Sequence, residues 1–219
     1  MFESIKKIFA WLAIGIAALG TVATLIIKWD DLIEVYCKFF CEPPPVAQCE
    51  NAQPVAQYAK DLFSNPNQAK LKVEILPDTS FKVGETMQMR FTSEKRGQLL
   101  VFDINSECAL TLIMPNQYYD EAFKLKANQE FTIPEKHWGF DLPAQEPLGE
   151  GSLLTILVEE GIDLKPILPV PFVEMKAEMM VKSILQHLHD QLKKEVMLNG
   201  VLRPRKWAGV FSDYEINNE

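Results

Sequence analysis

The strongest constraint in this sequence is a run of twenty residues without an ionisable side chain. Residues Ile8 to Ile27 read IFAWLAIGIAALGTVATLII. At a rise of about 1.5 Å per residue they make a helix of about 30 Å, which is the thickness of a bilayer's hydrocarbon core. A buried helix of a globular protein normally keeps a polar stripe, which this run lacks. The sequence therefore predicts a transmembrane helix over residues 8–28.

A cleaved signal peptide is the main alternative, because Lys6 and Lys7 precede the run as they do in exported proteins. The run is longer than a usual signal-peptide core, and no small-x-small site separates it from Lys28-Trp29-Asp30-Asp31. An uncleaved signal anchor is therefore favoured. Lysines before the span and acidic residues after it place residues 1–7 in the cytoplasm. We expect a single-pass protein of the inner (plasma) membrane, whose remaining residues lie in the periplasm or outside a bacterial cell.

Small side chains line one face of the predicted span at alternating spacings of three and four. Such a face lets a second membrane helix approach closely. Small residues are also common in membrane helices that pack against nothing, so both interpretations stay open. The residues of this face are Ala10, Ala13, Ala17, Gly20 and Thr24.

Residues 29–69 predict a juxtamembrane helix followed by a connector that contains cysteines. Four prolines between Glu42 and Pro54 indicate an extended spacer, and Ala56 to Ser64 predicts a short helix. We expect these segments to hold the following domain off the membrane.

The chain has four cysteines, and an even number outside the cytoplasm favours disulfides. A bridge between residues four apart on one helix would be strained, so a bridge that crosses the proline turn is easier. Metal ligation is disfavoured because a Cys-x-x-Cys pair is absent. Free thiols remain the alternative. The candidates are Cys37, Cys41, Cys49 and Cys108.

Net charge narrows the choice of partners. The whole chain carries −8, and the residues from Lys28 onward contain 20 Lys and Arg against 29 Asp and Glu. Such a domain repels phosphate backbones and anionic headgroups, so we expect no nucleic acid and no membrane contact beyond the span itself.

Residues 70–219 predict a mainly β domain, an antiparallel β-sandwich with one amphipathic helix. The helix is expected from Phe172 to Met197, where apolar residues recur at helical spacing, and Trp207 to Ile216 returns to a strand pattern that could close the sheet. The remaining β-rich runs, separated by turn residues, are Leu71 to Leu76, Thr86 to Thr92, Gln98 to Ile104, Leu110 to Met114, Ala122 to Ile133 and Leu153 to Glu159.

Five segments of this domain form a recognisable series: Phe81 to Glu85, Gly97 to Ile104, Leu112 to Asn116, Phe131 to Pro134 and Pro147 to Gly149. Over about residues 70–160 they resemble the bacterial domain of unknown function 4384. That resemblance implies a β-sandwich module, often fused to caspase-like peptidases or protein kinases, with a sensing, targeting or binding role. It implies no catalytic residues. This chain has the predicted span where other members carry a peptidase or kinase.

The residues themselves offer little chemistry. His187 and His189 lie two apart in the predicted helix, where their side chains diverge, so solvated or edge positions are expected. The serines lack a Gly-x-Ser-x-Gly elbow, and we find no glycine-rich phosphate loop, zinc signature or calcium loop. The sequence therefore predicts no catalytic residue, no metal site and no cofactor.

The expected function is a non-catalytic, membrane-anchored binding or scaffold module, an accessory subunit of a membrane or cell-envelope assembly. Protein partners are expected, whereas a small-molecule ligand is left open. Two alternatives remain: an extracytoplasmic sensor of a ligand or peptide that regulates a signalling or protease partner, and an enzyme with an unrecognised site. Aromatic residues on loops are common binding anchors. The candidates here are Tyr118, Tyr119, Trp138 and Phe140.

Overall fold

The computed structural model describes residues 53–64, 67–115, 123–135, 141–164, 167–168, 178–198 and 200–218. The predicted span with its small-residue face, three of the cysteines (Cys37, Cys41 and Cys49) and the loop residues Tyr118, Tyr119, Trp138 and Phe140 lie outside these residues. Within them, no helix has the length and apolar character needed to cross a membrane. The chain divides into two compact units, Met1–Pro45 and Val46–Glu219, and the second unit is the one described below.

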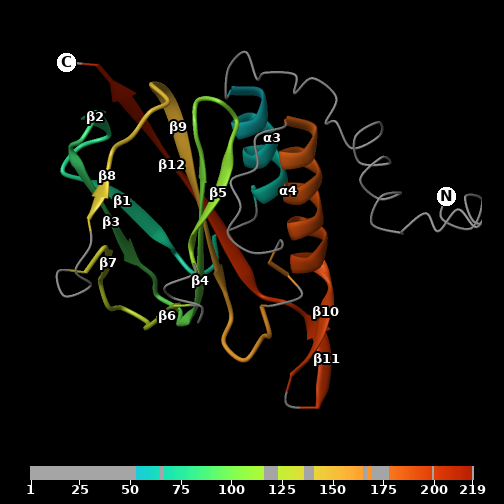
Figure 1. The fold of residues 1–219 in the computed structure, drawn as a ribbon. Coiled ribbons are helices and arrows are strands. Elements are labelled where there is room, and N and C mark those ends of the chain that lie inside the picture. Colours follow the sequence, from blue (N-terminus) through green and yellow to red (C-terminus); the bar gives the residue numbers. More distant parts are fainter. Residues whose placement is uncertain are drawn as a thin grey trace, which may run out of the picture. The chain divides into compact units, whose positions relative to one another are not determined.

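The larger of two main sheets has six strands, in the order β2-β12-β9-β4-β5 with β6 also paired to β4 (Figure 1). All its pairs are antiparallel except β12 with β2. The sequence-based prediction that the last β run closes the sheet is confirmed, because β12 lies between β9 and β2. The strands are β2 (Ser80–Lys82), β4 (Gly97–Ile104), β5 (Leu110–Met114), β6 (Phe123–Leu125), β9 (Gly149–Val158) and β12 (Trp207–Asn217).

A smaller sheet of four strands packs on one face of the larger sheet. Its strands pair antiparallel, with β3 in contact with all three others. Buried side chains from both sheets form one cluster, in which Phe91 and Ile133 of the smaller sheet meet Val101 and Leu157 of the larger one. The members are β1 (Lys72–Leu76), β3 (Thr86–Thr92), β7 (Phe131–Ile133) and β8 (Leu142–Pro143).

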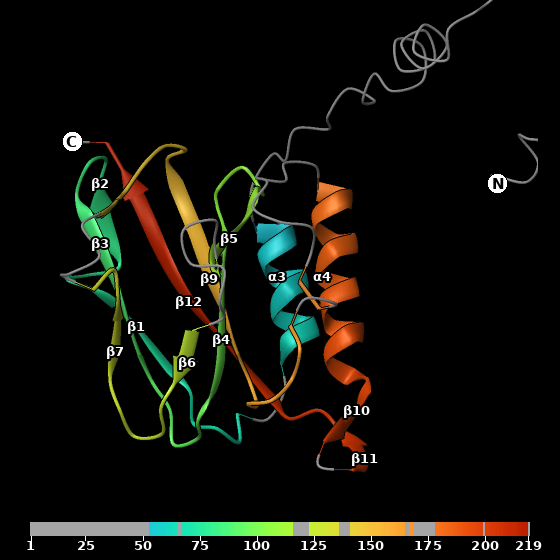
Figure 2. The same cartoon turned by 60° about the horizontal axis from the view of Figure 1, so that its bottom comes forward.

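Two helices, α3 (Gln53–Phe63) and α4 (Glu178–Lys193), cover the opposite face of the larger sheet (Figure 2). They run side by side in the same direction, since Tyr58 bonds to Gln186 and Phe63 contacts His189. Both helices bury apolar side chains against the sheet. The described residues are therefore mainly β, with antiparallel sheets and two helices, of which α3 corresponds to the short helix predicted from Ala56 to Ser64.

The second helix in this layer is α3, from the segment that the sequence assigns to the connector. Val55 and Ala59 are fully buried and Phe63 is almost so, at positions four residues apart that share one face of the helix. This face packs with α4 and the sheet in one core cluster. The core therefore includes residues upstream of the predicted boundary at residue 70.

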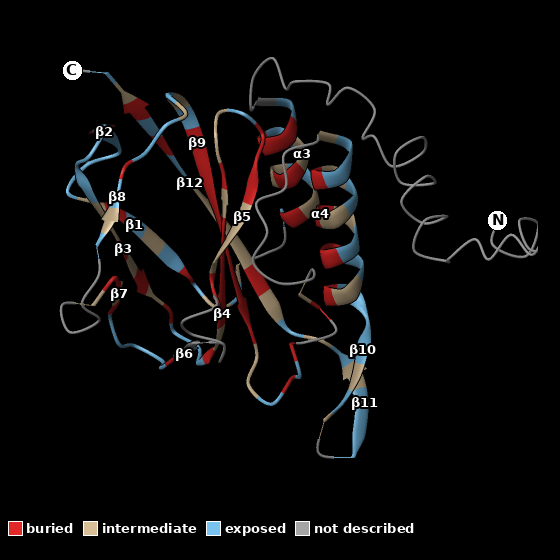
Figure 3. Ribbon diagram, in the orientation of Figure 1, coloured by how far each residue is buried: buried red, intermediate tan, exposed pale blue. Residues whose placement is uncertain are grey.

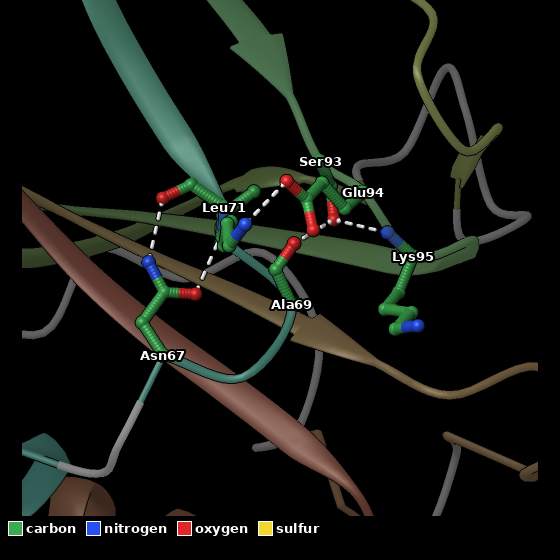
Figure 4. Close-up of polar contacts among 7 residues, drawn as sticks. Asn67, Ala69, Leu71, Ser93, Glu94 and Lys95 are labelled. Atoms are coloured by element: carbon green, nitrogen blue, oxygen red, sulfur yellow. Dashed lines mark hydrogen bonds and ion pairs between the residues drawn. The ribbon is translucent and has the colours of Figure 1, made fainter.

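The chain segment after α3 is tied to the smaller sheet by polar contacts (Figure 4). The side-chain amide of Asn67 donates to the Leu71 carbonyl at 2.7 Å, and its oxygen accepts the Leu71 N–H at 2.8 Å. The Ala69 carbonyl accepts bonds from the Ser93 hydroxyl at 2.8 Å and the Glu94 N–H at 2.9 Å. These contacts fix the path from α3 into β1.

The helix predicted from Phe172 to Met197 is shorter than expected. In the described residues α4 ends at Lys193, and the chain continues into the hairpin of β10 (Glu195–Leu198) and β11 (Val201–Pro204). An Asn-Gly pair between apolar residues is a strong hairpin signal, which here outweighs the helical spacing of the residues before it. Gly200, at the turn, has φ +77°, a conformation that glycine adopts without strain.

Burial follows these layers (Figure 3). Residues 151–158 of β9 are all buried, because the helices cover one face of the strand and the smaller sheet covers the other. The hairpin of β10 and β11 is largely exposed, and it pairs with no other strand among the described residues. The base of the hairpin is thus attached to the core, and solvent surrounds the rest of the hairpin.

Candidate functional site

An open groove of about 1540 Å³ lies at the end of the larger sheet where β9 begins and β12 ends. This end of the two strands is at the top of Figure 1. The first half of α3, the β4–β5 turn and the loop before β9 complete the walls. The groove is lined by Pro54, Ala56, Gln57, Lys60, Thr79, Ser80, Ser106, Glu107, Glu146, Pro147, Leu148, Gly149, Glu150, Gly151, Ser152, Asp213, Tyr214 and Glu215.

A polar network joins α3, which forms one wall of the groove, to strands β9 and β12, which form its floor. The ammonium of Lys60 donates to both carboxylate oxygens of Asp213, at 2.9 and 2.8 Å. The hydroxyl of Ser152, on the neighbouring strand, donates to the same carboxylate at 2.6 Å. Partial burial raises the pKa of Asp213, but the hydrogen bonds from Lys60 and Ser152 and the lysine charge outweigh it and keep the pKa below its ordinary value of 3.8.

This network resembles a nucleophile with a base, but its electrostatics fit a structural role. A carboxylate with a lowered pKa takes up a proton poorly, so Asp213 is a weak general base for Ser152. Ser152 lines the groove but is only 5% exposed, and its hydroxyl is already bonded to Asp213. The network therefore fastens α3 to the sheet.

A second polar pair lies under the groove, on the face of the larger sheet that meets the smaller one. The hydroxyl of Tyr214 donates to Asp103 at 2.7 Å, and it reaches this residue of β4 by lying across β9. Only glycine fits beneath the ring, because a Cβ on Gly151 would lie 2.3 Å from the ring carbon Cζ.

Burial is the main cause of the pKa shifts of Asp103 and Tyr214. It raises the pKa of Asp103 from 3.8 to about 6, against the opposing effect of the hydrogen bond from Tyr214. The pKa of Tyr214 also rises, first because the ring is buried and then because Asp103 lies next to it. Tyr214 therefore stays protonated and remains a hydrogen-bond donor.

The rim of the groove carries negative charge that no described residue neutralises. Four glutamates, Glu107, Glu146, Glu150 and Glu215, line it, and in the described part of the chain none of them forms an ion pair. Glu150 and Glu215 are directly opposite each other on β9 and β12. Like charges in that arrangement destabilise a sheet, so a cation that binds between them would relieve repulsion.

Two features of the β4–β5 turn border the groove. The side-chain oxygen of Asn105 accepts the N–H groups of Glu107 and Ala109, at 3.0 and 2.9 Å. The hydroxyl of Ser106 is buried next to Gly149 and has no hydrogen-bond partner among the described residues.

Cys108 ends this turn. It is fully buried and disulfide-bonded, and its partner lies outside the described residues, so the pairing stays a prediction.

One of the two helix histidines is placed differently from the sequence-based expectation. His187 is exposed, as expected. The prediction of a solvated or edge position for His189 is wrong, because it is buried edge-on against Phe63 and Trp207, with ring centroids 5.6 and 6.1 Å away. Burial lowers the pKa of His189, and the charge of nearby Lys193 lowers it further. The described residues contain no group of three His, Cys, Asp or Glu side chains placed to hold a metal ion.

Sequence reasoning missed the groove, because its residues come from five distant segments. The one local signal is the Gly149-x-Gly151 pair at the start of β9. Gly149 has φ +110°, which favours glycine, and Gly151 makes room for the Tyr214 ring. A strand that begins with two glycines can indicate close approach of another group.

The fold and groove together define a class: a β domain of two packed sheets with a helical layer on one face and a polar groove at one end. Residues 80–160 match the model of a family described as a domain of unknown function (DUF4384), which confirms the resemblance seen in the sequence. The match runs from β2 to just beyond β9, and it omits α3, α4 and β12. No curated protein and no solved structure matches this chain.

Proposed function

We propose that this protein is a membrane-anchored, non-catalytic binding or scaffold module, an accessory subunit of a membrane or cell-envelope assembly. The groove is the place where it binds a segment of a protein partner. The observation that carries this proposal is the open shape of the groove together with its four glutamates, which form no ion pair with any described residue.

The shape and charge of the groove favour a peptide-like ligand with positive charge. A small molecule usually binds in a largely enclosed, mostly apolar pocket, whereas this site is open and rimmed by carboxylates. Pro147 and Leu148 add apolar surface next to the glutamates. A segment that alternates lysine or arginine with apolar residues therefore complements the walls of the groove.

The apolar run over residues 8–28 supports the anchor, and its flanking charges support an extracytoplasmic domain. A partner is then expected in the same membrane or in the envelope beside it.

The test is extraction of the full-length protein from its native membrane in mild detergent, followed by mass spectrometry of what co-migrates. Stoichiometric partners should appear with the wild type and be lost from Glu150→Gln/Glu215→Gln. They should persist with Glu94→Gln/Asp141→Asn, which removes two exposed carboxylates outside the groove. A clean monomer would refute the accessory-subunit role, whereas partners that survive the groove substitutions would show that they bind elsewhere.

A further inference from the structure

The hairpin of β10 and β11 exposes large apolar side chains. Met197, Val201 and Leu202 are 66%, 59% and 58% exposed. Met197 and Leu202 are directly opposite each other in the strand pairing, so they lie on the same face of the hairpin. A small two-stranded hairpin with such a face gains little by itself, and an exposed apolar patch commonly marks an interaction surface.

The hairpin is nevertheless firmly attached at its base. The Arg203 guanidinium donates to both carboxylate oxygens of Glu159, with one of the two bonds at 2.9 Å. The same carboxylate accepts the Lys206 N–H at 2.7 Å. Partial burial raises the pKa of Glu159, but these bonds and charges outweigh it and keep the carboxylate ionised. A second contact holds the hairpin to the domain, since the side chain of Leu198 packs beside Gly161. The apolar face is therefore presented to solvent by a fixed element.

The surroundings of the hairpin are positive, in contrast to the chain as a whole. Arg203 and Arg96 are paired with Glu159 and Glu160. Three exposed lysines have no ion pair among the described residues, and the exposed carboxylates in the same stretch of chain are Asp190 and Glu195. The lysines are Lys193, Lys194 and Lys206.

The hairpin and the groove lie at opposite ends of the same two strands. The β9–β12 pairing runs from Gly149 opposite Ile216, beside the groove, to Val158 opposite Trp207, beside the hairpin. Ten residue pairs at about 3.3 Å each separate the two ends by about 30 Å. One copy thus presents an acidic groove at one end and a basic, apolar hairpin at the other.

We propose that the hairpin of one copy docks in the groove of a second copy, head to tail. This inference rests on the proposed function of the groove as a protein-binding site, and it names the partner as another molecule of the same chain. Met197 and Leu202 supply apolar contact for Pro147 and Leu148, and the lysines at the hairpin base complement the glutamates of the rim. Because the two surfaces differ, the contact is heterologous and can repeat from copy to copy.

The experiment measures the mass of the full-length protein in detergent by analytical ultracentrifugation, over a range of protein and salt concentrations. Wild type should self-associate, and salt should weaken the association. A groove variant, Glu150→Lys/Glu215→Lys, and a hairpin variant, Lys194→Glu/Leu202→Glu, should each raise the dissociation constant by about tenfold or more. Met179→Glu is the matched control, because Met179 is 84% exposed and lies on neither surface.

Mixing gives the decisive readout. The groove variant keeps an intact hairpin and the hairpin variant keeps an intact groove, so an equimolar mixture should regain association. Restored association also shows that both variants are folded. A circular dichroism spectrum like that of the wild type provides the same check for each variant alone.

Three results would overturn the inference: a wild type that stays monomeric, association that neither variant weakens, or folded variants that do not associate when mixed. The second result would assign the contact to another part of the chain. A monomeric wild type that still loses other partners with Glu150→Gln/Glu215→Gln would refute self-association and leave the proposed function standing. Absence of both partners and self-association would end both proposals.

Discussion

Replacing Asp103 with asparagine should stabilise the domain at neutral pH. The side chain keeps its shape, and its oxygen still accepts the bond from Tyr214, but it no longer carries a charge into a buried site. Keeping Asp103 ionised is unfavourable, because burial raises its pKa from 3.8 to about 6. At about 1.4 kcal/mol per pKa unit this corresponds to about 3 kcal/mol, an upper limit at neutral pH.

The pH dependence follows from the direction of the shift. Because the folded state binds the Asp103 proton more tightly than the unfolded state, this residue makes the wild type more stable as the pH falls from about 6 to 3.8. Other carboxylates, such as Asp213, act in the opposite direction, so the wild-type curve alone does not isolate Asp103. The difference between Asp103→Asn and wild type does, and it should shrink as the pH falls.

The assay is urea unfolding followed by circular dichroism at pH 7.5 and pH 4.5. We expect Asp103→Asn to gain between about 1 and 3 kcal/mol at pH 7.5 and much less at pH 4.5. Tyr214→Phe is the companion variant, and its loss should be about 1–3 kcal/mol at pH 7.5, since it leaves the Asp103 carboxylate buried without its donor. A less stable Asp103→Asn at pH 7.5, or a gain that does not change with pH, would refute the reasoning.

Three further predictions concern the same end of the domain. Gly151→Ala should cost about 2 kcal/mol or more in urea unfolding, because the added methyl displaces the Tyr214 ring; an unchanged midpoint would contradict the packing. Lys60→Met should loosen α3, seen as faster hydrogen exchange in residues 53–63, and should raise the pKa of Asp213, seen by NMR; protection equal to wild type would show that the network is dispensable. Peptide mapping without reductant should find Cys108 in a disulfide with a connector cysteine, and recovery of a free thiol would contradict it.

Strand positions were predictable where apolar residues alternate or run continuously. The run from Leu99 to Phe102 predicts a central strand, and the run from Trp207 to Ile216 predicts the strand that closes the sheet. Each of these two strands follows from which of its own residues are buried, and the local pattern of apolar residues indicates that burial. The short helix before residue 64 was also visible, but its place in the core was not, because four buried positions in eleven residues look much like a connector helix.

The parts that escaped prediction depend on contacts between distant segments. The end of α4 was misjudged because Val196 and Met197 continue the helical spacing while belonging to a hairpin. His189 was misjudged because its burial depends on Phe63 and Trp207, which come from other elements. The groove unites Lys60, Ser152 and Asp213 across more than a hundred residues of sequence, a distance over which spacing carries no information.

The position of β12 also constrains when this domain can form. It is the last strand of the fold in chain order, yet it lies inside the larger sheet, with β9 on one side and β2 on the other. Until β12 emerges during synthesis, β9 keeps an open, almost wholly apolar edge and Asp103 lacks its tyrosine donor. The domain therefore completes its sheet after translation of the preceding strands. A chain truncated before residue 207 would present an aggregation-prone edge in place of a folded surface.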